Sequence, residues 1–245
     1  MFFRLTLYTQ RYRMIAYAVL VMAVTVLSVL PVTLLWKNNA WHFVRATDPR
    51  AILLFWQEGT ARVIGALTIV LALCAGDLGV TAMGDDAAQR TLEWVATRPR
   101  TRQSLAWSAW AASLMNALLL VGLGIVCYAA VLLVSTHEFN WRYAALAVIS
   151  LIVPATAMLS LAYFLSVGTG SARNGYLLAL FILVFFAVLR FGYFNIVLKR
   201  YVPLWLFTTN NMYQPQMTLT VALWALAVSL VLSVGGAMVF ARRNL

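Results

Sequence analysis

The stretch Ala61–Met83 has the sequence ARVIGALTIVLALCAGDLGVTAM, in which Arg62 and Asp77 are the only charged residues. An α-helix rises about 1.5 Å per residue, so about 20 apolar residues cross the roughly 30 Å hydrocarbon core of a bilayer. In lipid, only helices and closed barrels satisfy every backbone polar group. The stretch lacks the alternating pattern of barrel strands, and it therefore predicts a transmembrane helix.

Five further apolar runs of similar or greater length flank this stretch. Together they predict an all-α protein with six transmembrane helices, organised as a single transmembrane domain over residues 1–245. The run 105–134 is longer than one crossing requires, so it must tilt or project from the bilayer. The predicted spans are about 14–36, 61–83, 105–134, 143–167, 176–198 and 219–240.

The composition supports the same class of protein. Hydrophobic residues make up 63% of the 245 residues and charged residues only 10%, and the mean hydropathy is +0.86. An ordinary globular domain is roughly 45–50% apolar and about 25% charged. The net charge of +11 flanks the apolar runs and suits anionic membrane lipid rather than nucleic acid, which would need a soluble basic face.

The N-terminal residues 1–13 mix aromatic and aliphatic residues with three arginines. They predict a short interfacial helix, with an unstructured basic tail as the alternative. The first apolar run is too long for the hydrophobic region of a signal peptide. Three arginines precede this run and only Lys37 follows it closely, so the positive-inside rule places both termini in the cytoplasm.

Residue patterns typical of catalysis are absent from the sequence. His42 and His137 are the only histidines, and neither belongs to an HExxH motif. Gly168–Ser171 lacks the lysine and the spacing of a phosphate-binding loop. Cys74 and Cys127 fall inside predicted spans and have no metal-ligand spacing. We therefore expect this chain itself to be neither an enzyme nor the holder of a cofactor or metal.

The polar segment between the second and third spans predicts a short cytoplasmic helix over residues 85–99. Asp86 is a suitable N-cap and Gln89 completes a capping box, while Pro99 disfavours helix at Arg98. Leu92 shares an apolar stripe with Ala88 and Val95. This stripe needs a cover, which is either the membrane surface or a partner protein.

The same segment resembles the cytoplasmic loop of ABC-2-type (type V exporter-like) transporter permeases. The family pattern is an acidic pair, then Gly-Thr-Leu-Glu, then Pro-Val-Ser-Arg. Arg90 and Arg100 depart from this pattern, which affects the local turn geometry. The resemblance covers about twenty residues in motif and the whole chain in layout. The matching residues are Asp86, Thr91, Leu92, Glu93, Pro99 and Arg102, with Thr101 where serine is usual.

This resemblance implies a permease subunit of an exporter in a bacterial inner membrane. The abundant Trp, Tyr, Phe and Met in the spans suit a hydrophobic or amphipathic compound as cargo, although the same residues are normal at lipid-facing positions. In the implied permease, the loop would be a coupling helix that docks into a separate ATPase subunit, with two such subunits per complex holding ATP and Mg. A second permease subunit, identical or related, would complete the complex. The residues implied in coupling are Asp86, Gln89, Arg90, Thr91, Leu92, Glu93, Val95, Arg98, Pro99 and Arg102.

A second feature of that family concerns residues 191–216. Members often carry short re-entrant helices between the fifth and sixth spans. Here the segment is long for a connector and contains the stretch Pro203–Phe207, which is too apolar for water and too short to span. A re-entrant hairpin and simple interfacial anchoring by Trp205 and Tyr201 both fit it. Its candidate residues are Pro203, Leu204, Trp205, Leu206 and Phe207.

Two charged residues lie within predicted spans and are candidates for function. Asp77, flanked by Gly76 and Gly79, is either a gate or ion-pair residue or part of a wetted helix end. Arg190 either extends its charge outward or pairs at the re-entrant segment. Intramembrane acids also suit a gradient-driven transporter or channel, which is the main alternative function. An intramembrane enzyme is a further alternative, although the spans lack clustered His, Asp or Glu.

Overall fold

The computed structural model describes residues 2–37, 49–83, 102–135, 141–191 and 219–242 of the chain. Within these ranges all regular structure is α-helical, which confirms the predicted fold class. The described ranges contain no β-strand. They are α1 (Phe2–Lys37), α3 (Pro49–Thr81), α6 (Arg102–Ser135), α7 (Trp141–Thr169), α8 (Ala172–Phe191) and α10 (Leu219–Arg242).

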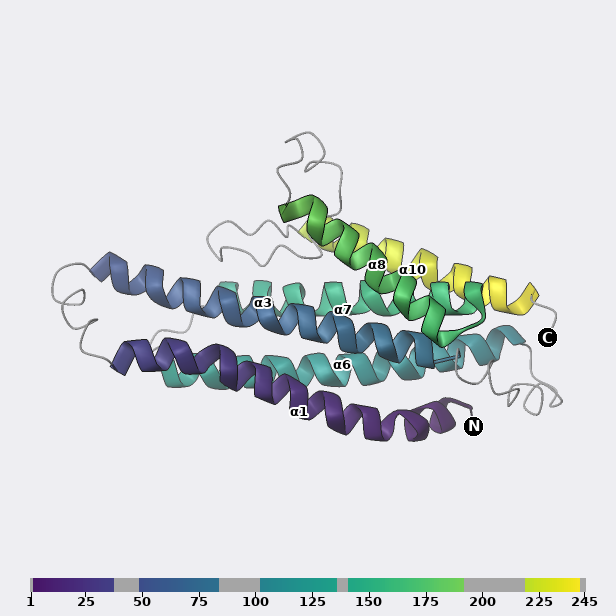
Figure 1. Ribbon diagram of the computed structural model, residues 1–245, viewed down its shortest axis with the longest axis horizontal. Coiled ribbons are helices and arrows are strands. Elements are labelled where there is room, and N and C mark those ends of the chain that lie inside the picture. Colours follow the sequence, from purple (N-terminus) through teal and green to yellow (C-terminus); the bar gives the residue numbers. More distant parts are fainter. Residues whose placement is uncertain (1, 38–48, 84–101, 136–140, 192–218, 243–245) are drawn as a thin grey trace.

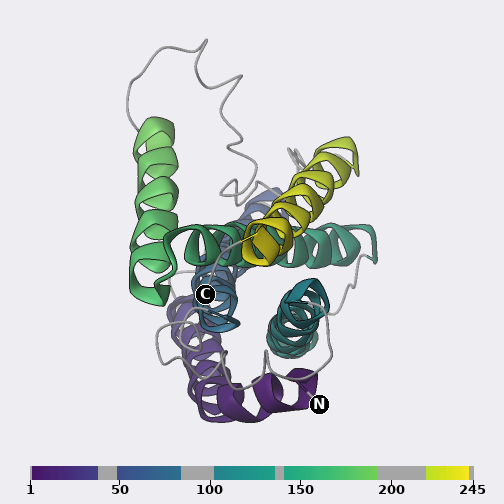
Figure 2. The same ribbon diagram turned by 90° about the vertical axis from the view of Figure 1, so that its right-hand side faces the viewer.

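Helices α3 and α7 pack against each other in the middle of the bundle (Figures 1 and 2). On one side α1 and α6 pack against each other and against α3. On the other side α8 and α10 each pack against α7. The central pair therefore connects the two outer pairs of helices.

The first residues of α1 and the last residues of α10 lie at the same end of the bundle (Figure 1). A buried cluster at this end joins Met83 after α3, Leu105 of α6, Val167 of α7 and Phe240 of α10. We call this the terminal end. The segment 84–101 connects α3 to α6 here, so its two anchor points lie close together. Which side of a membrane this end faces stays a prediction.

Five of the described helices are long and apolar enough to cross a membrane, judged by length and composition. The sixth, α8, has a shorter apolar stretch, Ala172–Phe185, among the residues whose side chains are described. Membrane-spanning character is thus supported, whereas the count of six spans stays a prediction. The five stretches are Gln10–Ser28, Val63–Thr81, Arg102–Ala130, Val148–Thr169 and Ala222–Arg242.

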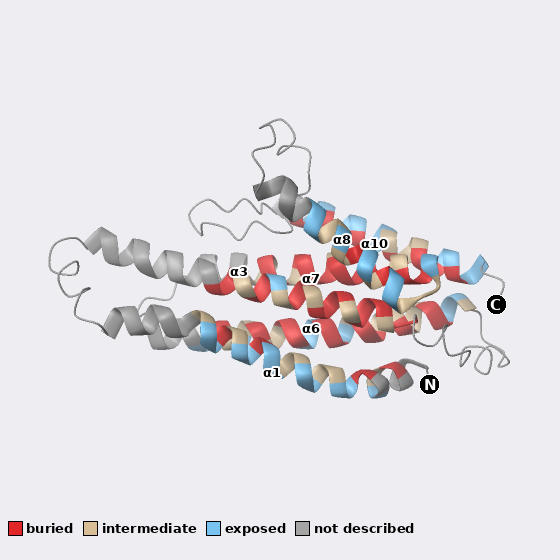
Figure 3. Ribbon diagram, in the orientation of Figure 1, coloured by how far each residue is buried: buried red, intermediate tan, exposed pale blue. Residues whose placement is uncertain are grey.

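Apolar side chains lie both on the outer faces and in the interior of the described bundle, and most of the buried polar side chains are small. Figure 3 shows exposed residues along the outer faces of α1, α8 and α10, including Leu27, Phe181 and Trp224. Threonines and serines such as Thr25 and Ser233 are buried and bond to backbone carbonyls of their own helices. Lipid tails can cover such a surface, whereas water cannot do so favourably.

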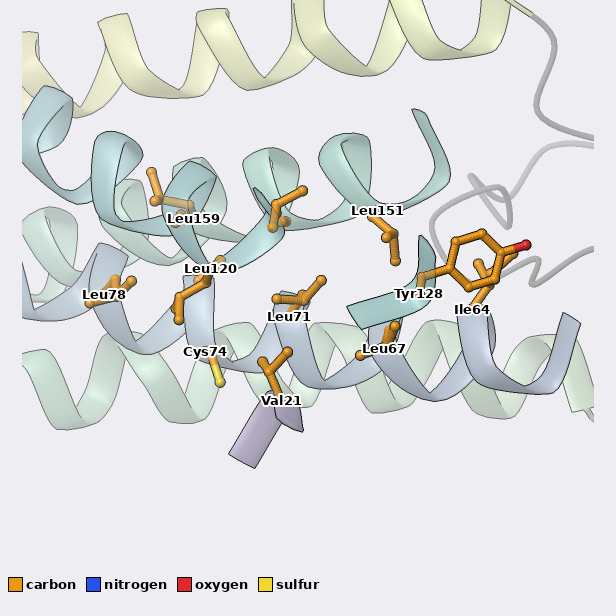
Figure 4. Packing of buried hydrophobic residues seen from close by; sticks show 14 of the residues in the cluster. Val21, Ile64, Leu67, Leu71, Cys74, Leu78, Leu120, Tyr128, Leu151 and Leu159 are labelled. Atoms are coloured by element: carbon orange, nitrogen blue, oxygen red, sulfur yellow. The ribbon is translucent and has the colours of Figure 1, made fainter. Parts of the chain in front are cut away.

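The largest buried cluster lies around α3 (Figure 4). Leu67, Leu71 and Leu78 of α3 contact a core that also contains Leu120 of α6 and Leu159 of α7. Small residues let these helices approach closely, as is common in membrane bundles. Helices α3 and α7 approach closely at Gly79, where an added Cβ would lie 2.4 Å from the Leu159 carbonyl oxygen.

The N-terminal residues differ from the expectation of a separate interfacial helix. Helix α1 continues without a break from Phe2 to Lys37, so residues 2–13 are the first turns of α1 and not a separate helix. Thr6 and Gln10 are buried against the bundle instead of lying on a membrane surface. The reason is that Gln10 has polar partners on α3 and α6, and the local sequence of the N-terminus does not reveal them.

The stretch Gly168–Ser171 forms a tight connection between α7 and α8. Gly170 has a φ of 68° and donates its N–H to the Ser166 carbonyl at 2.9 Å, which is a helix-ending arrangement that favours glycine. Ser171 then caps α8 by accepting from the Asn174 N–H at 3.4 Å. Gly170 therefore serves a helix–helix turn.

Candidate functional site

Asp77 lies on α3, one turn before the helix ends, and it forms an ion pair with α1. Its Oδ2 accepts from Arg13 Nη1 at 3.0 Å and also from the Tyr17 hydroxyl. Arg13 and Tyr17 are four residues apart and so share one face of α1. The side chains of Arg13 and Asp77 are 41% and 26% exposed. The structure therefore shows Asp77 in an ion pair, which is one of the arrangements predicted for it from the sequence.

A second group of polar side chains surrounds Gln10, one turn earlier on α1. Its Nε2 lies 2.9 Å from Ser113 Oγ on α6, 3.2 Å from the Leu78 carbonyl and 3.3 Å from Thr81 Oγ1 on α3. Asn116 Nδ2 in turn donates to Gln10 Oε1 at 2.8 Å. Gln10 is only 2% exposed, so both ends of its amide are satisfied inside the protein.

Together these residues form a polar cluster that joins three helices at the terminal end. We define it as Gln10, Arg13, Tyr17, Asp77, Thr81, Ser113 and Asn116. Interhelical hydrogen bonds in membrane proteins are worth about 0.6 kcal/mol on average and up to about 1.7 kcal/mol. Several such bonds close together therefore fix α1 against the end of α3 and the first half of α6. Among the described residues, no group of His, Cys, Asp and Glu could hold a metal ion.

The other site residues from the sequence are placed as follows. Arg102 is the first residue of α6 and is half-buried at the terminal end. Arg190 belongs to α8, but only its backbone is described. The predicted coupling helix, 85–99, lies outside the described residues. So do Pro203, Leu204, Trp205, Leu206 and Phe207, and most of the segment 191–216.

Sequence reasoning found Asp77 but missed the residues around it. A signal for them was present, since Gln10, Arg13 and Tyr17 recur at spacings of three and four and so lie on one helix face. Ser113 and Asn116 show the same spacing inside the run 105–134. Polar residues that share one face of an apolar helix are expected to turn toward partners in the protein rather than toward lipid.

Gln10→Leu tests how strongly the cluster holds the bundle. The substitution keeps the side-chain volume but leaves Asn116 and Ser113 without their partner. An unsatisfied buried polar group costs about 1–3 kcal/mol, so we expect a lower thermal midpoint in detergent. Gln103→Leu is the matched control, because Gln103 is exposed near the start of α6. This variant should change the thermal midpoint little. Equal midpoints for the two variants would contradict a structural role for Gln10.

Comparisons with known proteins supply no family, since no protein-family model and no curated protein matches the chain. The fold therefore defines the class on its own. The chain is a multi-pass, all-α membrane protein with long apolar helices and a polar cluster between helices at one end.

Proposed function

We propose that the chain is the permease subunit of an ATP-driven transporter of the ABC-2 type. The observation that carries this proposal is the position of the polar cluster. It connects α1 to α3 and α6, the two helices that flank residues 84–101. A force applied to this segment would therefore reach three helices together, as a coupling element requires.

In this proposal the terminal end faces the cytoplasm, and the chain crosses the membrane six times. Two ATPase subunits, which bind ATP and Mg, dock on the coupling helices of two permease subunits. The pathway between the permeases exports a hydrophobic or amphipathic compound across a bacterial inner membrane. Residues 191–216 form a re-entrant hairpin at the opposite end. The arginines Arg11, Arg173 and Arg242, exposed at the terminal end, agree with a cytoplasmic orientation.

The Arg13–Asp77 pair also supports a second candidate, a gradient-driven transporter. An acid within a membrane span is the group that such proteins use to bind a coupling ion or proton. In that case no ATP-binding partner would exist. The two functions therefore differ in whether an ATPase accompanies the chain.

The experiment is co-purification of the ATPase with variants of residues 85–99. Leu92→Asp should abolish retention, because it removes about 1.5–3 kcal/mol of apolar burial and places a carboxylate in a desolvated cleft. Glu93→Ala should keep the complex assembled, since an exposed charge pair contributes only about 0–1 kcal/mol. Trp205→Ala, on the opposite side of the membrane, is the control and should not alter retention.

Each outcome of this experiment separates the hypotheses. If no ATP-binding chain co-purifies and the preparation has no nucleotide-dependent activity, the transporter is not ATP-driven. If Leu92→Asp retains an ATPase as well as the wild type does, residues 85–99 form only a helix on the membrane surface. Equal membrane insertion of all variants must be shown first.

A further inference from the structure

The outer face of α1 carries an aromatic and basic cluster that the proposed function does not use. The Arg11 guanidinium carbon lies 4.0 Å from the centre of the Tyr8 ring and 4.6 Å from that of Tyr12. Arg11 Nη2 also donates to the Tyr12 hydroxyl at 2.8 Å. Tyr8 and Tyr12 are 60% and 69% exposed. Both rings hold the guanidinium in place while the cluster stays open to the surroundings.

The positive charge of Arg11 is directed away from the protein. Gln10, Arg13 and Tyr17 turn inward, and the acid at this level, Asp77, bonds to Arg13 and Tyr17. Among the described residues, Arg11 has no carboxylate partner in an ion pair. A guanidinium carries five N–H donors, so Arg11 keeps donors for an external anion after its bond to Tyr12.

The depth of this cluster matches a membrane interface. Arg11 lies at the start of the apolar stretch Gln10–Ser28. It precedes Arg13 by two positions, which corresponds to a rise of about 3 Å along the helix. Tyrosine is enriched at this level, where its ring faces the apolar region and its hydroxyl faces the headgroups. An anion that meets Arg11 here is therefore at the depth of lipid phosphate groups.

An exposed apolar stripe continues from the cluster along the same face of α1. Tyr8 and Tyr12 are followed at spacings of three and four by Ile15, Val19, Met22 and Val26, all of them exposed. From Tyr12 to Val26 the helix rises about 21 Å, more than half the roughly 30 Å hydrocarbon core. α1 packs against α3 and α6 through its other face, which buries Val21 and Thr25.

We propose that this face of α1 is a binding site for an anionic phospholipid. The phosphate accepts hydrogen bonds from Arg11 and from the tyrosine hydroxyls, and one acyl chain lies along Ile15, Val19 and Met22. The planar guanidinium suits a phosphate because it donates two parallel bonds. The proposal requires only that α1 spans the membrane, and it holds whether or not an ATPase binds the chain.

The test uses the full-length chain in nanodiscs of phosphatidylcholine with a minor fraction of phosphatidylglycerol. The phosphatidylglycerol retained after extraction is measured by native mass spectrometry. Arg11→Gln should weaken retention on the order of tenfold, the factor that corresponds to about 1.4 kcal/mol. Arg11→Lys should lie between, because it keeps the charge but loses the bidentate geometry. Tyr8→Phe with Tyr12→Phe should reduce retention by removing two hydroxyls while both rings stay.

Arg242→Gln is the matched control, since Arg242 is an exposed arginine at the same end of the bundle. It should leave retention of phosphatidylglycerol unchanged. Equal losses for Arg11→Gln and Arg242→Gln would show general charge attraction and overturn the proposal. Release of the lipid by millimolar inorganic phosphate would identify the ligand as a free anion, and would overturn it as well. Unchanged thermal midpoints show that loss of lipid does not arise from misfolding.

Discussion

Gly79→Ala is expected to destabilise the folded bundle by about 1–3 kcal/mol or more, the range for overpacking a close contact. A Cβ at this position would lie 2.4 Å from the Leu159 carbonyl oxygen and 3.2 Å from the Tyr163 backbone nitrogen. These atoms belong to the backbone of α7 and have no rotamer that moves them aside. The central helices α3 and α7 would therefore have to separate, which lowers the thermal midpoint measured in detergent.

Two other glycines provide graded controls for this measurement. Gly122→Ala on α6 meets no atom within 4 Å, and alanine favours a helix by about 0.8–1.0 kcal/mol over glycine, so the midpoint should stay or rise. Gly76→Ala places its Cβ 3.3 Å from Met158 Cγ, and a flexible methionine can adjust. The expected order of midpoints is Gly122→Ala highest, then Gly76→Ala, then Gly79→Ala. A Gly79→Ala midpoint equal to that of the wild type would contradict this close approach.

The helices could be predicted from the sequence because hydropathy and length are local properties. The predicted run 61–83 ends two residues beyond α3, and the helix begins much earlier than the run, at Pro49. Proline is favoured at the first helical position because its fixed φ suits the helix. The residues between Pro49 and Ala61 include polar groups, and hydropathy therefore detects only the apolar part of this helix. For the same reason, hydropathy predicted a separate N-terminal helix ending at Arg13, whereas α1 is continuous from Phe2 to Lys37.

The candidate site could be predicted only in part. Asp77 was found because an acid within an apolar run is costly and rare. Its partners on α1 are 60 and 64 residues away in sequence, and nothing in one sequence indicates which helix faces which. The coupling helix rests on a local motif and lies outside the described residues, so its role stays a prediction.

Asp77→Asn and Arg13→Gln, alone and combined, are expected to show that the ion pair fixes α1 to α3. Each single variant removes the ion-pair contact between the two side chains and keeps one of the two charges. Breaking a fully buried pair costs about 3–5 kcal/mol, but exposed pairs contribute about 0–1 kcal/mol. For this half-buried pair we expect about 1–2 kcal/mol for each single variant, between these limits. The double variant should recover part of the loss, because it removes both charges together. Thermal midpoints of the wild type, the two single variants and the double variant give the coupling energy between the two side chains. Additive losses would mean that the ion pair does not stabilise the contact between α1 and α3.

The same four proteins distinguish a structural tether from an ion-binding acid. If the pair only fixes α1 to α3, transport should follow stability, and the double variant should transport better than either single variant. If Asp77 instead binds a coupling ion, both variants that carry Asp77→Asn lose gradient-driven transport, however stable the double variant is. Arg13→Gln would then keep transport while losing stability, because the acid remains. Transport into vesicles, measured with ATP and separately with an imposed ion gradient, distinguishes a structural ion pair from an acid that binds a coupling ion. The ABC-2 proposal predicts that activity follows the midpoints and requires ATP.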